Sequence, residues 1–275
     1  MLFLSSVNSV VKHEYMKGIV MIDHDNLEDF RDAELYDLRD EGYYDDYPLT
    51  EQWARATGGP LLDLACGTGR MALRLAGLGY QVTGVDITPE MIARARQKAA
   101  QQVLSIDWVV ADACTFHLGK QFPFIYMLEN AWQFFLTRAN QEVLLARVRE
   151  HLLPEGCFLF ETRNPNPRNL QYARRLEPQK YNTSDGGQLV VADQQYYDPM
   201  TQIQHYTSTF TFFGPDGLQQ REKIVRVALR YVYPQEMEAL LHYNGFEIRT
   251  CYGSWQQEPL IASSPAMIYV CRRRA

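Results

Sequence analysis

The chain lacks the patterns that metal-binding, nucleic-acid-binding and membrane-spanning proteins usually carry. Its five cysteines form no C-x-x-C pair and no cluster with histidine, so no metal site is expected. Lys and Arg number 27 against 33 Asp and Glu, and the net charge of -6 argues against a nucleic-acid partner held by its phosphates. The apolar start, Met1-Leu2-Phe3-Leu4, is too short to cross a bilayer, and no other segment is a candidate span. These absences favour a cytoplasmic protein whose cysteines stay reduced in the core.

The length is sufficient for one large α/β domain with an insertion. The chain has 275 residues, of which 46% are hydrophobic, as in ordinary globular proteins. Residues 1–25 are expected to be a disordered N-terminal extension or, because Met16 and Met21 could each be the true start, an artefact of the reading frame. No positive charge precedes the apolar N-terminal residues, so a signal peptide is not expected.

The stretch from residue 61 to residue 76 predicts a buried strand, a glycine turn and a helix in succession. Leu61–Leu64 is an apolar run, Gly67-Thr68-Gly69 breaks it, and Met71–Ala76 consists of good helix formers. Strand, turn and helix in this order form the first unit of a nucleotide-binding α/β sheet. Glycine lets the backbone approach a ligand closely, and the free N–H groups at the helix start suit a carboxylate or a phosphate.

Two classes of ligand use such a turn. Gly67-x-Gly69-x-x-Ala72 satisfies the loose dinucleotide pattern, and Asp86 lies about 20 residues on, where an acid that binds a ribose is expected. Asp63, inside the strand, can reach an ammonium group, which a dinucleotide lacks. An acid for an ammonium, helix N–H groups for a carboxylate and an acid for a ribose together describe S-adenosylmethionine.

On these residues the chain resembles a known family. Asp63-Leu64-Ala65-Cys66-Gly67-Thr68-Gly69-Arg70 is similar to the first motif, acid-x-Gly-x-Gly-x-Gly, of the class I S-adenosylmethionine-dependent methyltransferases of the small-molecule type. Ala65 departs from the first glycine but is also small. The resemblance, which extends over residues 61–165, implies an α/β fold with a seven-stranded, mostly parallel Rossmann-like sheet, helices on both faces and an antiparallel hairpin at the end. It also implies S-adenosylmethionine as cofactor and S-adenosylhomocysteine as product.

The resemblance also assigns roles to residues that follow the predicted strands. It gives the ribose to Asp86, after the second strand, and the adenine to Asp112, at the end of a third strand over residues 106–113. An N-terminal segment that folds over the cofactor would supply Tyr36 and Tyr47, although packing of the helix onto the sheet explains both tyrosines equally well. The implied cofactor-binding residues are Tyr36, Tyr47, Asp63, Ala65, Cys66, Gly67, Gly69, Asp86, Ile87, Met91, Asp112, Ala113 and Glu129.

The acceptor pocket is expected where the fourth strand ends. The resemblance places this point opposite the transferable methyl group, and the implied pocket residues are Asn130, Trp132, Gln133, Arg163 and Tyr206. Core packing explains Trp132 equally well. Some family members have a histidine base near Gln133, but an amide cannot accept the proton. Either no base acts from this position or the acceptor is already nucleophilic. His205 is the first candidate if a base is needed, although a lone histidine is more often not a catalyst.

The α/β alternation stops after the fifth strand. Val-, Thr-, Tyr- and Phe-rich segments over residues 188–197, 202–213 and 218–233 predict strands, separated by turn sequences at Asp198-Pro199 and Gly214–Gly217. Short turns imply an antiparallel sheet. Residues 167–233 are therefore expected to be an antiparallel β insertion that roofs the acceptor site. Residues 26–166 and 234–275 would form the S-adenosylmethionine-binding domain.

The sequence thus predicts a methyltransferase that moves a methyl group from S-adenosylmethionine to a nitrogen or oxygen of a small molecule by in-line displacement. A tRNA-modifying methyltransferase, an NAD-dependent oxidoreductase and a non-catalytic protein that keeps the cofactor site remain as alternatives. The expected partner is the small-molecule acceptor, with the chain acting as a monomer or homodimer, away from the membrane.

Overall fold

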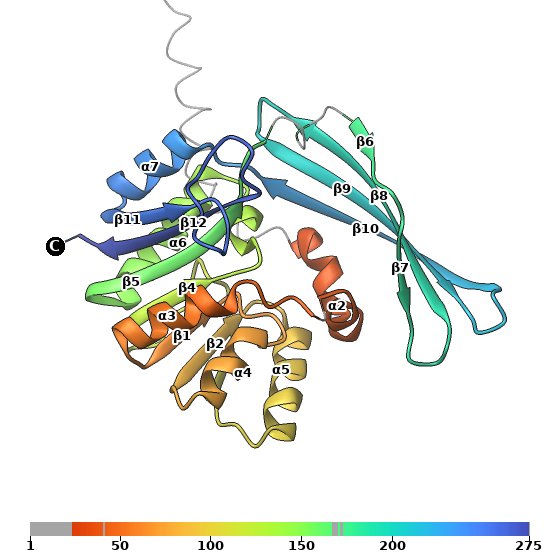
Figure 1. Cartoon of the computed structure of the whole chain (residues 1–275), viewed down its shortest axis with the longest axis horizontal. Coiled ribbons are helices and arrows are strands. Elements are labelled where there is room, and N and C mark those ends of the chain that lie inside the picture. The colour runs from red at the N-terminus through yellow and green to blue at the C-terminus, as the bar shows by residue number, and fades with distance from the viewer. Residues whose placement is uncertain (1–23, 41, 167–169, 171–172, 275) are drawn as a thin grey trace, which may run out of the picture.

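A computed structural model describes residues 24–40, 42–166, 170 and 173–274. The predicted N-terminal extension lies outside these residues except for its last two positions. The chain forms two separate sheets, a seven-stranded one (sheet A) and a five-stranded one (sheet B), with an N-terminal helical segment between them (Figure 1). No helix in the described ranges is both long and apolar enough to cross a bilayer.

Sheet A has the topology that the motif resemblance predicts. Its strand order is β11-β12-β5-β4-β1-β2-β3, and the pairs among β1 to β5 are parallel. The last two strands pair antiparallel with each other and with β5, which confirms the predicted hairpin. The strands are β1 (Leu61–Leu64), β2 (Val82–Asp86), β3 (Asp107–Val110), β4 (Phe122–Met127), β5 (Leu152–Arg163), β11 (Phe246–Tyr252) and β12 (Ala266–Arg273).

Helices cover sheet A on both faces, as predicted. On one face, apolar residues of α3 (Tyr47–Thr57) and α4 (Arg70–Gly77) pack in a common core with β1 and β4. On the other, α6 (Arg138–His151) and α7 (Pro234–Tyr243) do the same. Helix α5 (Pro89–Gln101) contacts β2 and β3. The central strands β1, β2 and β4 are therefore buried on both sides, which explains the apolar sequences of β1 and β4, whereas the edge strand β3 is partly exposed.

Two glycines are needed where the glycine turn meets the sheet. Gly69 has a φ of 82°, and a Cβ there would lie 2.4 Å from the ring of Trp108 on β3. A Cβ on Gly84, in β2, would also lie 2.4 Å from that ring. The sequence argument assigned the turn glycines to ligand approach, but the structure shows that Gly69 makes room for a tryptophan of the sheet.

The third strand is shorter than predicted. β3 ends at Val110, and Asp112 lies in the loop beyond it. The strand stops because Asp112 begins a turn: its backbone carbonyl accepts hydrogen bonds from the N–H groups of Thr115 and Phe116. Its carboxylate accepts one from the N–H of Cys114, an arrangement that aspartate commonly stabilises.

Sheet B is antiparallel and falls within the predicted insertion. β8 (Gln188–Asp198), β9 (Ile203–Phe213) and β10 (Gln219–Arg230) are the three strands expected from the sequence. β6 (Ala173–Arg175) and β7 (Gln179–Asn182), which were not predicted, both pair with β8. Their short, largely exposed sequences carry no alternation of apolar and polar residues.

Sheet B packs on the N-terminal segment, which comprises η1 (His24–Arg31) and α2 (Ala33–Asp40). Leu35 lies in a small apolar core with Leu189 and Phe210 of the sheet. The Asn26 side chain forms two hydrogen bonds with the backbone of Ala228 on β10, of 2.8 and 2.6 Å. The N-terminal segment therefore lies between the two sheets and contacts β10 of sheet B and helix α5, which packs on sheet A (Figure 1).

Candidate functional site

A cleft opens at the carboxyl ends of the parallel strands of sheet A. It lies at the point where the strand order reverses, between β1 and β4, which is where open α/β sheets bind ligands. The N-terminal segment closes one side through Leu27, Phe30 and Tyr36. The predicted cofactor residues that line the cleft are Tyr36, Asp63, Ala65, Cys66, Gly67, Asp86, Ile87, Ala113 and Glu129.

Asp63 is a buried carboxyl group in the floor of the cleft. It lies on β1 opposite Tyr126 of β4, and only 3% of the residue is exposed. Burial raises the pKa of Asp63 well above its usual range, and the Tyr126 hydroxyl acts in the opposite direction. A cationic group in the cleft would favour the ionised carboxylate. Asp63 therefore suits a ligand that carries an ammonium or sulfonium charge.

Asp86 joins the end of β2 to the glycine turn. One carboxylate oxygen accepts a hydrogen bond from the Gly67 N–H at 2.9 Å, and the other accepts one from the Thr88 N–H at 2.8 Å. Burial raises the pKa of Asp86, while these backbone donors act to lower it. Each carboxylate oxygen can accept a second hydrogen bond, so Asp86 can still bind the hydroxyls of a ribose.

Asp112 has a buried oxygen without a hydrogen-bond partner. Its Oδ1 accepts from the Cys114 N–H at 2.7 Å, but Oδ2 has no partner among the described residues. The neighbouring Ala111 and Ala113 line the cleft. A buried acceptor without a donor is costly, so a ligand amino group would stabilise this position. With Asp63 and Asp86, this oxygen fits the donor pattern of S-adenosylmethionine.

Four of the predicted cofactor residues, Asp112 among them, are not part of the cleft lining. Gly69 faces Trp108, and Met91 is a buried residue of α5. The Tyr47 ring lies 5.2 Å from the Arg70 guanidinium and 5.6 Å from that of Arg74. The structure therefore places Tyr47 in the packing arrangement that the sequence left open, whereas Tyr36 is at the cleft.

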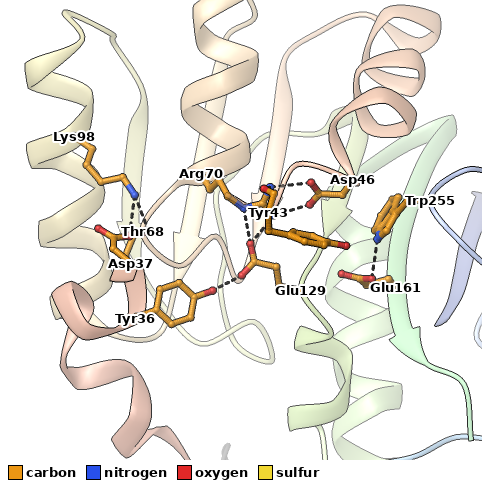
Figure 2. A network of polar contacts seen from close by, with 10 residues as sticks. All are labelled: Tyr36, Asp37, Tyr43, Asp46, Thr68, Arg70, Lys98, Glu129, Glu161 and Trp255. Carbon is orange, nitrogen blue, oxygen red and sulfur yellow. Dashed lines mark hydrogen bonds and ion pairs between the residues drawn. The ribbon is translucent and has the colours of Figure 1, made fainter. Parts of the chain in front are cut away.

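Arg70 connects three parts of the site, although the sequence argument assigned it no role (Figure 2). Its guanidinium pairs with both carboxylate oxygens of Asp46, at 2.8 and 2.6 Å, and donates to the backbone carbonyl of Tyr43. It also donates twice to Oε1 of Glu129, at 2.8 and 2.6 Å. The other oxygen of Glu129 accepts a hydrogen bond from the Tyr36 hydroxyl. The only feature of the sequence that could have indicated a role for Arg70 in the site is its position directly after the glycine turn.

A second ionic cluster fastens α2 to the glycine turn and to α5. The carboxylate of Asp37 accepts hydrogen bonds from the Thr68 hydroxyl at 2.7 Å and from Lys98 at 3.0 Å (Figure 2). It also accepts one from Arg94 at 2.8 Å. Burial acts to raise the pKa of Asp37, but these donors lower it overall. The N-terminal segment is thus held to the cofactor loop by charged contacts.

Glu161 is a buried carboxyl group on β5 near Glu129. Its Oε2 accepts a hydrogen bond from the Trp255 indole at 3.2 Å. Burial, together with the negative charges of Asp46 and Glu129, raises the pKa of Glu161 to about 7. The side chain is therefore close to half-protonated at neutral pH.

The predicted acceptor residues occupy the boundary between the two sheets. Trp132, in η2 (Ala131–Phe134), is buried and stacks on Phe160, so it packs in the core. Gln133 is buried and donates to the Arg230 carbonyl at 3.3 Å, which ties η2 to β10. Asn130 has a buried side-chain oxygen without a partner in the described structure.

Arg163 and Tyr206, the remaining acceptor residues, come together from different sheets. The Arg163 Nη1 donates to the Tyr206 hydroxyl at 3.2 Å. His205, the neighbour of Tyr206, is exposed and stacks on Tyr196. Side chains alternate between the faces of a strand, so His205 lies on the face of sheet B opposite Tyr206. The structure does not bring His205 to the cleft.

His117, Glu150 and His151 form a group with metal-ligand side chains away from the cleft. Both ring nitrogens of His151 are engaged by the backbone, with Leu118 N–H at 3.0 Å and the Arg147 carbonyl at 2.8 Å. His117 pairs with Glu150 at 2.8 Å. A metal ion would have to replace these hydrogen bonds, so the group does not suggest a metal centre.

Comparison with known proteins agrees with this geometry. Residues 61–156 match the family model of a methyltransferase domain. The chain is 31% identical over 132 residues to a putative methyltransferase, YqeM, of Bacillus subtilis, covering 47% of this chain and 53% of that protein. It is 30% identical over 136 residues to a dTDP-3-amino-3,6-dideoxy-α-D-glucopyranose N,N-dimethyltransferase of Streptomyces fradiae, with 47% and 52% covered. The chain thus spans about half the length of these relatives.

A solved structure extends the likeness to nearly the whole chain. The CcbJ methyltransferase of Streptomyces caelestis superposes with a TM-score of 0.75 at 24% identity, covering 91% of this chain and 99% of that one. At this identity the comparison establishes the fold. The chain therefore contains a methyltransferase domain and has the fold of the class I S-adenosylmethionine-dependent methyltransferases, the family that its first motif resembles.

Proposed function

We propose that this protein transfers a methyl group from S-adenosylmethionine to a nitrogen or oxygen atom of a small molecule. The observation that carries the proposal is the set of three carboxyl groups, Asp63, Asp86 and Asp112, around one glycine turn. Asp63 lies within β1, Asp86 ends β2 and Asp112 follows β3, and each has the burial or the free acceptor capacity that one part of the cofactor needs.

Each of these residues would bind a different part of the cofactor. Asp63 would hold the ammonium group, Asp86 the ribose hydroxyls, and Asp112 the adenine amino group. When bound, the cofactor supplies an activated methyl group on a sulfonium sulfur whose departure as a thioether needs no proton. The work of the protein is then to align the acceptor with that methyl group and to exclude water.

The N-terminal segment would perform both tasks. Leu27 and Phe30 place apolar side chains over the cleft, and the Tyr36 hydroxyl reaches Glu129 at its edge. Both oxygens of Glu129 are already engaged, by Arg70 and Tyr36, so this residue is not arranged as a general base. A nitrogen acceptor that attacks as its free amine is therefore favoured over an alcohol, which would need its proton removed.

The name of one relative is consistent with a nitrogen acceptor. The Streptomyces fradiae protein is an N,N-dimethyltransferase of an amino sugar nucleotide. Amino sugars are therefore the first acceptor class to examine for this chain. Two of the alternatives from the sequence, tRNA modification and NAD-dependent oxidation, have no support from these relatives, which are methyltransferases by name.

The proposal is tested by calorimetric titration of the protein with S-adenosylmethionine, S-adenosylhomocysteine and NAD in parallel. We expect the first two to bind and NAD not to bind. Binding of NAD alone would contradict the roles given to Asp63 and Asp112. A mass-spectrometric screen with matched amine and alcohol acceptors then tests the choice of atom, and a methylated alcohol without a methylated amine would overturn the preference for nitrogen.

A further inference from the structure

Arg163 lies where the carboxyl edge of sheet A meets sheet B. It is the last residue of β5, two positions after Glu161, and pairs with Ala266 of β12. The residue is half-buried. Its guanidinium donates to the Tyr206 hydroxyl of β9 at 3.2 Å and lies 6.0 Å from the centre of that ring. Arg163 therefore connects the two sheets through the phenol of Tyr206.

Arg163 has no ion pair within the described residues: no carboxylate lies within 4.0 Å of its guanidinium. Glu161, two positions earlier on β5, acts on Arg163 only electrostatically, and its own raised pKa leaves it close to half-protonated at neutral pH. The hydrogen-bond partners of Arg163 are neutral: the Tyr206 hydroxyl at 3.2 Å and Tyr231, which directly follows β10. An arginine keeps its charge under all ordinary conditions, and a partly buried charge is costly unless an opposite charge compensates it.

Other arginines between the two sheets have carboxylate partners. Arg39 pairs with Asp29 at 2.8 Å, Arg70 with Asp46 at 2.6 Å, and Arg230 with Glu236 at 2.8 Å. Their side chains are between 13% and 21% exposed. The chain thus places an acid at ion-pair distance from comparable arginines and not from Arg163, which suggests that a ligand supplies the directly paired negative charge.

The position of Arg163 connects it to the proposed site of methyl transfer. Glu161 lies on the same strand, and the negative charge of Glu129 at the edge of the cleft helps to raise the pKa of Glu161. The next residue after Glu129, Asn130, has a buried side-chain oxygen with no partner in the described structure. An acceptor that enters between the sheets can therefore meet a polar atom near Glu129 and a cation at Arg163.

We propose that Arg163, oriented by Tyr206, is an anion-binding subsite for the methyl acceptor, and that the acceptor carries a carboxylate or phosphate group. The planar fork of the guanidinium matches both groups through paired N–H donors. The assignment to the acceptor rests on the proposed methyltransferase function, whereas binding of the anion itself does not. Anion binding would thus fix one end of the acceptor, while its nucleophilic atom faces the cofactor.

The test uses the full-length protein saturated with S-adenosylhomocysteine, and a parallel sample without it. Sodium acetate and inorganic phosphate are titrated by calorimetry, with methylammonium chloride as the cationic control. We expect one anion or both to bind and methylammonium not to bind. Acetate alone indicates a carboxylate acceptor, and phosphate alone indicates a phosphorylated one. In Arg163→Gln the anion affinity should fall about 10-fold or more, the usual loss for a charge-assisted pair.

Two further variants separate this role from a structural one. Arg226→Gln removes the same charge from the exposed face of β10 and should leave anion affinity unchanged. Arg163→Lys keeps the charge without the fork and should bind the anion with intermediate affinity. Equal anion affinity in wild type and Arg163→Gln, or no anion binding to wild type, would overturn the subsite. Failure of S-adenosylhomocysteine to bind would instead overturn the proposed function, since the sample without it still reports anion binding.

Discussion

Sheet A and sheet B differ in how they are covered. The site has a floor, formed by sheet A, and a roof, formed by the N-terminal segment and sheet B. Helices bury sheet A on both faces, and its strand ends form the floor of the cleft. Sheet B is packed on one face against the N-terminal segment, while its other face carries exposed side chains such as Tyr196, His205 and Arg226. The floor is thus built from contiguous motifs, and the roof from segments far apart in the sequence.

Ionic contacts are concentrated where the N-terminal segment meets the glycine turn. Arg70 and Asp37 are the central residues of two clusters that connect these two parts (Figure 2). Apolar packing joins the N-terminal segment to both sheets, through Leu27 to the core of sheet A and through Leu35 to sheet B. We therefore expect changes in charge to act at the junction of roof and floor, and changes in volume to act in the floor.

The largest effect is expected from removing the Arg70 charge. Arg70→Met should lower the unfolding free energy by about 3–5 kcal/mol, because Asp46 would be left as a buried carboxylate without a partner. Urea denaturation followed by tryptophan fluorescence measures the loss. Arg74→Met, which breaks an ion pair of a half-exposed arginine with Glu51, is the control and should cost less than about 1 kcal/mol. Equal losses of unfolding free energy in the two variants would show that Arg70 contributes no more to stability than an arginine in an exposed ion pair.

The second-largest effect on stability is expected from adding a methyl group to the floor of the site. Gly69→Ala should cost about 2–4 kcal/mol, since the residue has a φ of 82° and the new Cβ would lie 2.4 Å from Trp108. The matched variant Gly77→Ala, at the end of α4, meets no atom within 4 Å and should be neutral or slightly stabilising. The same denaturation experiment compares them. A neutral Gly69→Ala would mean that Trp108 is free to move.

Glu161 should make stability depend on pH. Its folded pKa of about 7 lies above the ordinary 4.5, so the folded state binds the extra proton. The stability from this group is complete below about pH 4.5 and is lost as pH rises through 7. Glu161→Gln should therefore be more stable than wild type at pH 8, by up to about 3 kcal/mol, and this gain should vanish below pH 5. A gain that is constant with pH, or one that Glu222→Gln on the exposed face of sheet B reproduces, would contradict the assignment.

Measuring the affinity for the cofactor product tests the residues of the floor independently of those of the roof. Asp86→Ala should weaken S-adenosylhomocysteine binding by about 1–3 kcal/mol, because buried hydrogen bonds to the ribose are lost. Calorimetry gives the change directly. Asp107→Ala, an exposed acid at the start of β3, is the matched control and should bind as wild type does. Unchanged affinity in Asp86→Ala would mean that the ribose lies elsewhere.

The smallest effect is expected on the exposed face of sheet B. His205→Ala should change neither cofactor affinity nor stability by more than about 0.5 kcal/mol, because the side chain is exposed and lies away from the cleft. Methyl transfer, once an acceptor is found, should continue at the wild-type rate. A loss of turnover alone would restore His205 as a candidate base and would require sheet B to move.

The acceptor residues show where sequence reasoning succeeds and where it fails. Arg163 and Tyr206 were placed together in the acceptor pocket, and the structure joins them by a hydrogen bond. His205 was chosen for its chemistry, but the alternation of side chains along β9 turns it outward. The identity of a residue predicts what it can do, whereas its orientation on a strand depends on the register of the whole sheet.

The sequence by itself determined the floor of the site. The apolar run around Asp63, the glycine turn, the acid that ends β2 and the acid that follows β3 lie within about 50 residues of one another. Their order is enough to define a parallel α/β sheet and its ligand edge. Each of these signals is local, because strand, turn and helix propensities act over a few neighbouring residues.

Only the tertiary structure decided the roof. The partners of Arg70 lie 24 and 59 residues away, and Asn26 meets Ala228 across 202 residues. The same holds for Tyr47, which packs on Arg70 instead of lining the cleft. No local pattern encodes these contacts, because they arise when separately formed elements bury their apolar faces and bring charges from distant segments together.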